Sequence, residues 1–208
     1  MVWPLPVEKK LATLFAIAFA VVVLDQAVNF WMVAELTSRF DGLPTLGARL
    51  QAMYGSPPPE GYDGLHFRPK RSFTLSPDYL RIRYAENTGA AFGLFRGLPP
   101  AARGLLFHLV SLGAVVLITL YYLRLSSTAP EERFARIGLA LVLGGALGNY
   151  LDRLARGFVV DFVEAHWHER ATWPSFNVAD SCIVVGVGLL LLDGLVRREH
   201  KVEVSPGG

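Results

Sequence analysis

The chain contains one cysteine and few charged residues, and both shortages limit what it can be. A single cysteine, Cys182, cannot form an internal disulfide. Charged residues make up 18% of the 208 positions and the formal net charge is only +2, which is too small to indicate nucleic-acid binding. The hydrolase motifs Gly-x-Ser-x-Gly and His-Glu-x-x-His are also missing, and His166-x-His168 alone is a weak metal motif. The sequence therefore supports neither a serine hydrolase nor a metal site.

Apolar residues are abundant instead. They make up 52% of the chain, and the mean hydropathy is +0.35. They occur in runs of about 20 residues, the length that crosses a bilayer as a helix. We predict membrane-spanning helices at residues 11–34, 101–123, 134–154 and 178–195. The chain is thus predicted to be a polytopic membrane protein with a single domain, residues 1–208.

The first apolar run also has the features of a secretory signal peptide. Lys9 and Lys10 precede it, and Ala18-Phe19-Ala20 is similar to a cleavage site. Because the apolar character continues to Ala34, we expect a retained membrane helix rather than a cleaved signal.

Basic residues predict how the four helices are oriented. Clusters at residues 9–10, 124–136 and 197–201 fall on one side of the membrane, and the positive-inside rule makes that side cytoplasmic. Both termini are then cytoplasmic. Polar residues from distant parts of the sequence converge at the opposite, outer ends of the helices: Asp25, Asn87, Asn149, Arg153, Asp161 and Asp180.

The region between the first two spans is predicted to lie outside the membrane. Residues 56–64 contain three consecutive prolines, which exclude a helix or a central strand, and we interpret residues 40–77 as an extracytoplasmic insert. Residues 79–84 alternate apolar and polar side chains, as a half-buried strand does. Asn87-Thr88-Gly89 is typical of a hairpin turn, and residues 90–95 would form the returning strand.

Two aspartates, Asp161 and Asp180, border the most informative stretch. Each lies at the edge of a strongly apolar segment, and Trp167, Trp173 and Pro174 between them suit a membrane–water boundary. We expect a loop and a short interfacial helix here that bring the two carboxyls together. Two close carboxyls share one proton, so that one activates water while the other polarises a carbonyl. Alternatively, Asp161 caps the interfacial helix, and Asn177 and Asp180 form the capping arrangement of the last span.

Four motifs, taken together, resemble those of the lipoprotein signal peptidase (signal peptidase II) family. They are Asn87-Thr88-Gly89-Ala90-Ala91-Phe92-Gly93, Gly148-Asn149-Tyr150-Leu151-Asp152-Arg153, Val160-Asp161-Phe162 and Phe176-Asn177-Val178-Ala179-Asp180-Ser181. They occur in the order and spacing of that family, and the resemblance covers the first span and nearly all of residues 84–195.

The resemblance implies an aspartic endopeptidase of the bacterial inner membrane. It would remove signal peptides from prolipoproteins by cutting before a diacylglyceryl-modified cysteine, with Asp161 and Asp180 as the catalytic dyad. The supporting residues it implies are Asn87, Gly89, Asn149, Arg153, Asn177 and Asp25. The implied fold is all-α, with four membrane helices, a small β-sheet cradle around residues 79–95 and an interfacial helix on the outer face. The enzyme would need no cofactor or metal, contact membrane lipids and act as a monomer.

The chain departs from the family pattern at two places. The family commonly has Asp-Gln-x-x-Lys in the first span, whereas Asn29 stands at the lysine position here. Residues 40–77 are also longer than the segment that the family usually carries. Two other classes are alternatives: a small transporter or channel subunit with an acidic pocket, and a scaffolding protein. The apolar inner halves of the last two spans argue against a polar pathway, and a scaffold leaves the clustered polar groups without a purpose.

Overall fold

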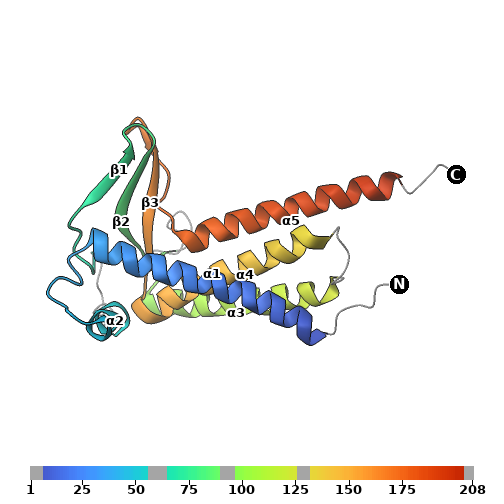
Figure 1. Cartoon of the computed structure of the whole chain (residues 1–208), viewed down its shortest axis with the longest axis horizontal. Helices are drawn as coiled ribbons and strands as arrows, with labels where there is room; N and C mark the ends of the chain where they lie inside the picture. Colours follow the sequence, from blue (N-terminus) through green and yellow to red (C-terminus); the bar gives the residue numbers. More distant parts are fainter. Residues whose placement is uncertain (1–6, 56–64, 90–96, 126–131, 204–208) are drawn as a thin grey trace. The chain divides into compact units, whose positions relative to one another are not determined.

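The computed structural model describes residues 7–55, 65–89, 97–125 and 132–203. In this part of the chain, four helices are long and apolar enough to cross a membrane: Val7–Leu36, Ala101–Arg124, Arg133–Arg156 and Val178–Val196. They confirm the four predicted spans. The elements, in chain order, are α1 (Val7–Leu36), α2 (Leu46–Tyr54), β1 (Ser72–Ser76), β2 (Leu80–Asn87), α3 (Pro100–Arg124), α4 (Arg133–Arg156), β3 (Val159–Trp167), β4 (Ala171–Thr172) and α5 (Val178–Glu203) (Figure 1).

The described residues form two compact units, and the first is entirely helical. It contains residues 7–23, 111–125, 132–147 and 179–203. Its core is a cluster of buried apolar side chains that includes Leu14, Ala18, Tyr122, Leu139 and Leu143. Large apolar side chains elsewhere in the unit are exposed, as expected for helices whose outer surface faces lipid rather than water.

Glycines allow the helices of this unit to pack so closely that an added Cβ would contact atoms of the neighbouring helix. A Cβ on Gly138 would lie 2.7 Å from the carbonyl oxygen of Gly186, and one on Gly186 would lie 2.7 Å from that of Gly138. Gly144 lies against Ala18 and Val21 of α1 in the same way. Because lipid gives helices no hydrophobic reason to associate, such small-residue contacts supply much of their packing energy.

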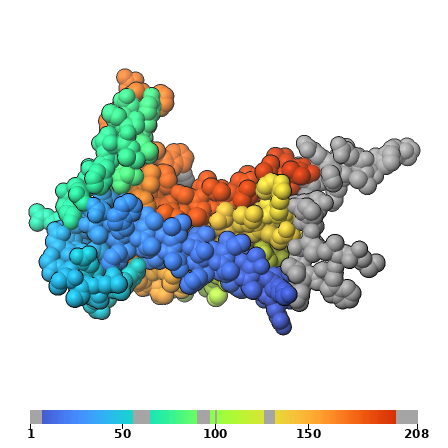
Figure 2. Space-filling model, in the orientation of Figure 1, coloured from blue at the N-terminus to red at the C-terminus, as the bar shows by residue number. Residues whose placement is uncertain are grey.

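The second unit contains the sheet and comprises residues 24–55, 65–89, 97–110 and 148–178. The strand order is β1-β2-β3-β4, with each neighbouring pair antiparallel. Figure 1 shows β1, β2 and β3 side by side, and in Figure 2 the green and orange atoms of these strands rise to one side of the C-terminal end of α1. The strand expected at residues 79–84 is confirmed as β2, whereas the returning strand expected at residues 90–95 lies outside the described residues.

The prediction of an interfacial helix between the last two spans is wrong, because that stretch forms the antiparallel pair of β3 and β4. Val159, Val160 and Val163 are β-branched and favour a strand. The turn at the end of β3 has positive φ at His168 (45°) and Glu169 (55°). The short helix outside the spans is α2, which lies within the insert, and the insert also supplies β1, which was not predicted from the sequence.

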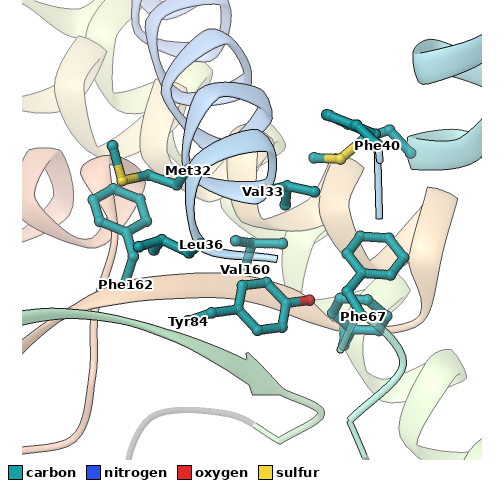
Figure 3. Close-up of a cluster of buried hydrophobic side chains, with 10 residues drawn as sticks. Met32, Val33, Leu36, Phe40, Phe67, Tyr84, Val160 and Phe162 are labelled. Carbon is teal, nitrogen blue, oxygen red and sulfur yellow. The ribbon is translucent and has the colours of Figure 1, made fainter. Parts of the chain in front are cut away.

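A cluster of buried apolar side chains joins α1, the sheet and the insert (Figure 3). Met32, Val33 and Leu36 of α1 contribute to it, with Tyr84 of β2 and Val160 and Phe162 of β3. The insert adds Phe67 and Met53, which are 1% and 0% exposed. Residues 40–55 and 65–77 are therefore an integral part of the core that supports β3.

Candidate active site

Asp161 lies on β3 and is 2% exposed. Ala85 of β2 is its partner across the sheet. The register of β2 against β3 shifts between Ile82 and Ala85, so the ladder is irregular beside Asp161. Such bulges are frequent next to active sites, where they redirect a side chain. The geometry thus gives this carboxyl a buried position in an irregular part of the sheet.

The segment before α5 is hydrogen-bonded to the same strand. The carbonyl oxygen of Phe176 accepts from the backbone N–H groups of Phe162 (3.2 Å) and Val163 (2.9 Å), and Phe176 N–H donates to the carbonyl of Val163 (3.0 Å). Asn177 follows and is 1% exposed. Its amide Nδ2 donates to the backbone carbonyl of Val160 (3.3 Å). Asn177 is therefore fixed beside the strand that carries Asp161.

The structure brings together five of the residues predicted as supporting groups. Asn177 Nδ2 also donates to Asn149 Oδ1 (3.0 Å). Arg153 donates from Nη1 to the carbonyl of Asn149 (3.1 Å) and from Nη2 to that of Gly89 (2.9 Å). The N–H of Gly89 donates to Asn87 Oδ1 (3.1 Å), which closes the turn after β2. The motifs thus meet through an amide and guanidinium network, which suits the recognition of peptide carbonyls.

Asp25 belongs to a second, adjoining network of buried polar groups. Asn29 Nδ2 lies 3.2 Å from both Asp25 Oδ2 and Asp152 Oδ2. Gln26 Nε2 likewise donates to Asp25 Oδ2 (3.0 Å) and Asp152 Oδ1 (2.6 Å). Asp152 also forms an ion pair with Arg156, one helical turn later. Two buried carboxylates are thereby held by shared amide donors and a guanidinium group, as buried charges require.

The last turn of α4 explains how this second network reaches β3. The helix ends at Arg156, and Gly157 follows with φ of 77°, a left-handed conformation that favours glycine at a helix C-terminus. The chain then enters β3, and Val160 N–H donates to Asp152 Oδ2 (3.2 Å). The backbone of Val160 is consequently held on both sides of its Cα, by Asp152 at its N–H and by Asn177 at its carbonyl.

Asp180 lies in the first turn of α5, three residues after Asn177, and is partly exposed. A carboxylate is favoured at that position by the partial positive charge of the helix N-terminus. The Tyr54 hydroxyl donates to Gln26 Oε1 (3.2 Å) and so extends the second network. Gln26, Tyr54, Asp152 and Arg156 of this network were not among the site residues predicted from the sequence. The i,i+4 spacing of Asp152 and Arg156 was the available signal for an ion pair.

Ion pairs on the sheet are separate from both networks. Glu164 of β3 is 1% exposed and pairs with Arg81 and Arg83 of β2. The hydrogen bond from Arg81 to Glu164 raises the pKa of the Arg81 guanidinium above its usual value. His168 pairs with Asp78 (3.1 Å), while His166 is buried on β3. Among the described residues, no group of three or more His, Cys, Asp or Glu side chains is arranged to hold a metal ion.

Comparison with known proteins agrees with this architecture. A family model described as signal peptidase (SPase) II matches residues 17–196. A lipoprotein signal peptidase of Anaeromyxobacter sp. (strain Fw109-5) is 44% identical over 192 residues, which cover 88% of this chain and 84% of the relative. That of Symbiobacterium thermophilum is 45% identical over 129 residues, covering 61% and 77%. A solved bacterial membrane enzyme matches with a TM-score of 0.61 and 24% identity, over 91% of this chain and 92% of that one.

Within the described residues, four helices long and apolar enough to span a membrane, together with a small antiparallel sheet, define a multi-pass membrane protein. The match over most of the chain then gives its identity: it belongs to the signal peptidase II family. It is an aspartic peptidase with lipoprotein signal peptidase activity, which removes the signal peptides of prolipoproteins. The family assignment decides against the transporter and scaffold alternatives.

Proposed function

We propose that Asp161 and Asp180 form the catalytic dyad of this peptidase. One carboxylate takes a proton from the attacking water, and the other, as the carboxylic acid, polarises the scissile carbonyl. Two interacting carboxyls share one proton more easily than they both ionise, so each can hold the protonation state that its role needs. No cofactor is required for this chemistry.

The observation that carries the proposal is that the backbone of Val160, immediately before Asp161, is hydrogen-bonded to a side chain at both its N–H and its carbonyl. Asp152 accepts from its N–H (3.2 Å) and Asn177 donates to its carbonyl (3.3 Å). Asn177 also immediately precedes α5, whose first turn carries Asp180. Groups from two separate motifs therefore fix the backbone next to one proposed catalytic carboxyl, and the second follows from the same short segment. Rigid support of this kind is what catalytic geometry requires.

The supporting groups suit a peptide substrate. We assign Arg153, Asn149, Asn87, Gly89 and Asn177 to holding the substrate backbone near the dyad, because amide and guanidinium N–H groups match peptide carbonyls. Asp25 supports the site through its contacts with Asn29 and Gln26. The enzyme cuts before a diacylglyceryl-modified cysteine, whose acyl chains stay in the bilayer and set the depth of the scissile bond.

The proposed arrangement in the cell follows from the charge pattern. Both termini lie in the cytoplasm, and the sheet, the insert and the proposed dyad lie at the outer face of the bacterial inner membrane. Membrane lipids surround the exposed apolar faces of the spans. The enzyme acts as a monomer, because one chain carries every group assigned to the reaction.

Replacement of either aspartate tests the dyad. Asp161→Asn and Asp180→Asn should each lower cleavage of a diacylated prolipoprotein by at least about a hundredfold, because an amide can neither accept the water's proton nor donate as an acid. A gel-shift assay with the purified enzyme measures this loss. Asp41→Asn, which changes an exposed carboxyl (59%), is the matched control and should cleave normally.

Two outcomes would contradict the mechanism. Full cleavage by either variant removes that residue from the dyad. Loss of cleavage when the wild type is treated with EDTA would indicate a metal-dependent reaction instead. A folded but inactive Asp161→Asn variant, judged by an unchanged melting curve in detergent, is the expected result.

A further inference from the structure

We infer that Tyr54 and Arg156 are positioning residues for the peptidase reaction, which hold Asp152 against the Val160 peptide and so fix the strand that carries Asp161. The inference rests on the proposed role of Asp161. It also assigns a purpose to the insert, because α2 of the insert supplies Tyr54.

The first step is the contact between Asp152 and β3. Asp152 is 0% exposed, and its Oδ2 accepts from Val160 N–H. A hydrogen bond from a peptide to a buried carboxylate is strong and directional, so the position of this carboxylate determines that of the peptide. Any group that orients Asp152 therefore acts on Asp161 through one peptide unit.

The second step is the orientation of Asp152. Arg156 is 1% exposed and forms an ion pair with the Asp152 carboxylate, while Gln26 Nε2 donates to its Oδ1 (2.6 Å). Gln26 can serve as a donor only if its Nε2 faces the carboxylates, and its Oε1 must then find a donor of its own. The Tyr54 hydroxyl is that donor, at 3.2 Å.

The third step is the position of Tyr54. Its ring lies over the Arg156 guanidinium, with 5.2 Å from Cζ to the ring centroid, so one side chain contacts both groups that orient Asp152. Helix α2 is held firmly. Arg39 donates from Nε (2.9 Å) and Nη2 (2.7 Å) to the carbonyl of Ala52, and Met53 is fully buried. The insert thus forms a rigid base for Tyr54.

The test compares Tyr54→Phe with Tyr121→Phe. Tyr54→Phe removes only the hydroxyl that orients Gln26 and keeps the ring over Arg156. We expect kcat on a diacylated prolipoprotein to fall about three- to tenfold with KM unchanged, the size expected for one lost hydrogen bond. Tyr121 is an exposed tyrosine of α3, and its variant should match the wild type. A kcat for Tyr54→Phe within twofold of wild type would overturn the inference.

The pH dependence of kcat separates positioning from loss of folded enzyme. A smaller folded fraction scales the whole profile down without changing its shape, and that result would also overturn the inference. A displaced Asp161 instead shifts a limb of the profile, because its environment changes.

Substitution of Arg156 tests the second positioning residue. Arg156→Gln should lower kcat and Arg156→Lys should recover part of it, since the lysine restores the positive charge beside Asp152.

Asp161→Asn distinguishes this inference from the proposed function. If Asp161→Asn is inactive while Tyr54→Phe is normal, the dyad stands and only the positioning role fails. If Asp161→Asn cleaves normally, the proposed function fails, whatever Tyr54→Phe does.

Discussion

Asn29 is an uncharged residue in contact with two buried carboxylates. The family resemblance predicts a lysine at its position, and the sequence alone indicated a missing positive charge near the site. In the structure, Asn29 Nδ2 lies 3.2 Å from both Asp25 Oδ2 and Asp152 Oδ2, and Arg156 forms an ion pair with Asp152. An amide that serves two acceptors, together with a guanidinium on α4, therefore contacts these carboxylates where the family pattern places a lysine.

Tyr54 gives this network a measurable dependence on pH. Burial raises the pKa of its phenol above the usual 10.0, and the nearby Asp152 and Asp25 carboxylates add to the rise while Arg156 opposes it. The folded state therefore keeps the proton to a higher pH than the unfolded state does. The resulting stabilisation is complete below pH 10 and is lost as the pH rises through the raised value.

We therefore expect the melting temperature of the wild type to fall more steeply than that of Tyr54→Phe as the pH rises above about 10 and through the raised pKa of the phenol. The phenylalanine variant has no phenol to titrate at this position, whereas every other titrating group is common to both proteins. Thermal unfolding in detergent across this range gives the comparison. Parallel curves for the two proteins would show that Tyr54 is not buried as described.

At the scale of elements, the contact between α4 and α5 depends on Gly145. A Cβ at this position would lie 2.4 Å from the carbonyl oxygen of Ala179, the residue before Asp180. Backbone atoms cannot yield as a flexible side chain can. Gly145→Ala should therefore push α5 away and destabilise the protein by about 1–3 kcal/mol, the usual cost of overpacking.

Gly188→Ala is the matched control for this substitution. Gly188 also lies on a membrane helix, but nothing lies within 4 Å of the place that an added methyl group would take, so alanine should be neutral or should stabilise the helix by up to about 1 kcal/mol. Thermal unfolding in detergent should give a lower melting temperature for Gly145→Ala than for Gly188→Ala. Equal melting temperatures would mean that α4 and α5 do not approach closely at Gly145.

The elements also show what could be predicted from sequence. Long apolar runs indicated the four spans, and alternation at residues 79–84 indicated β2, because both patterns are local. Strand β3 was missed because its first half, Val159 to Phe162, is buried throughout and does not alternate; only residues 163–167 alternate apolar and polar side chains. Strand β1 was also missed, although Phe73 and Leu75 alternate with polar residues. These two side chains are exposed, so they do not form a buried face of the sheet.

The residues of the candidate site also divide into those that sequence motifs indicated and those that only the structure revealed. Asn149, Arg153, Asn177 and Gly89 belong to motifs, and the structure places them in one hydrogen-bond network. Tyr54 could not have been found, because its contact with Gln26 joins residues 28 positions apart that no local pattern relates. Motifs identified the groups proposed to touch the substrate, and only the fold identified those that support them.

At the scale of the whole molecule, the proposed orientation can be tested by chemical labelling. Gln51→Cys, at an exposed position of α2, should react with a membrane-impermeant maleimide added to cells with a permeabilised outer membrane. Glu8→Cys, exposed at the start of α1, should react only after the inner membrane is opened, because the positive-inside rule places it in the cytoplasm. The parent chain, with Cys182 alone, measures the background.

The reverse pattern, with Glu8→Cys labelled in intact spheroplasts and Gln51→Cys protected, would invert the proposed topology. Labelling of both positions would place the first helix outside the membrane. The reversed pattern would also move Asp161 of the proposed dyad away from the outer face, since the insert packs against β3 in one apolar cluster.

The way α2 is built in has a consequence for inhibition. Met53 of this helix is buried and Tyr54 is partly buried, while Leu46, Leu50 and Gln51 are exposed. A soluble molecule such as an antibody fragment that binds these exposed residues and tilts the helix would displace the Tyr54 hydroxyl from Gln26. In the proposed orientation, such a molecule would reach α2 from the aqueous phase without entering the bilayer.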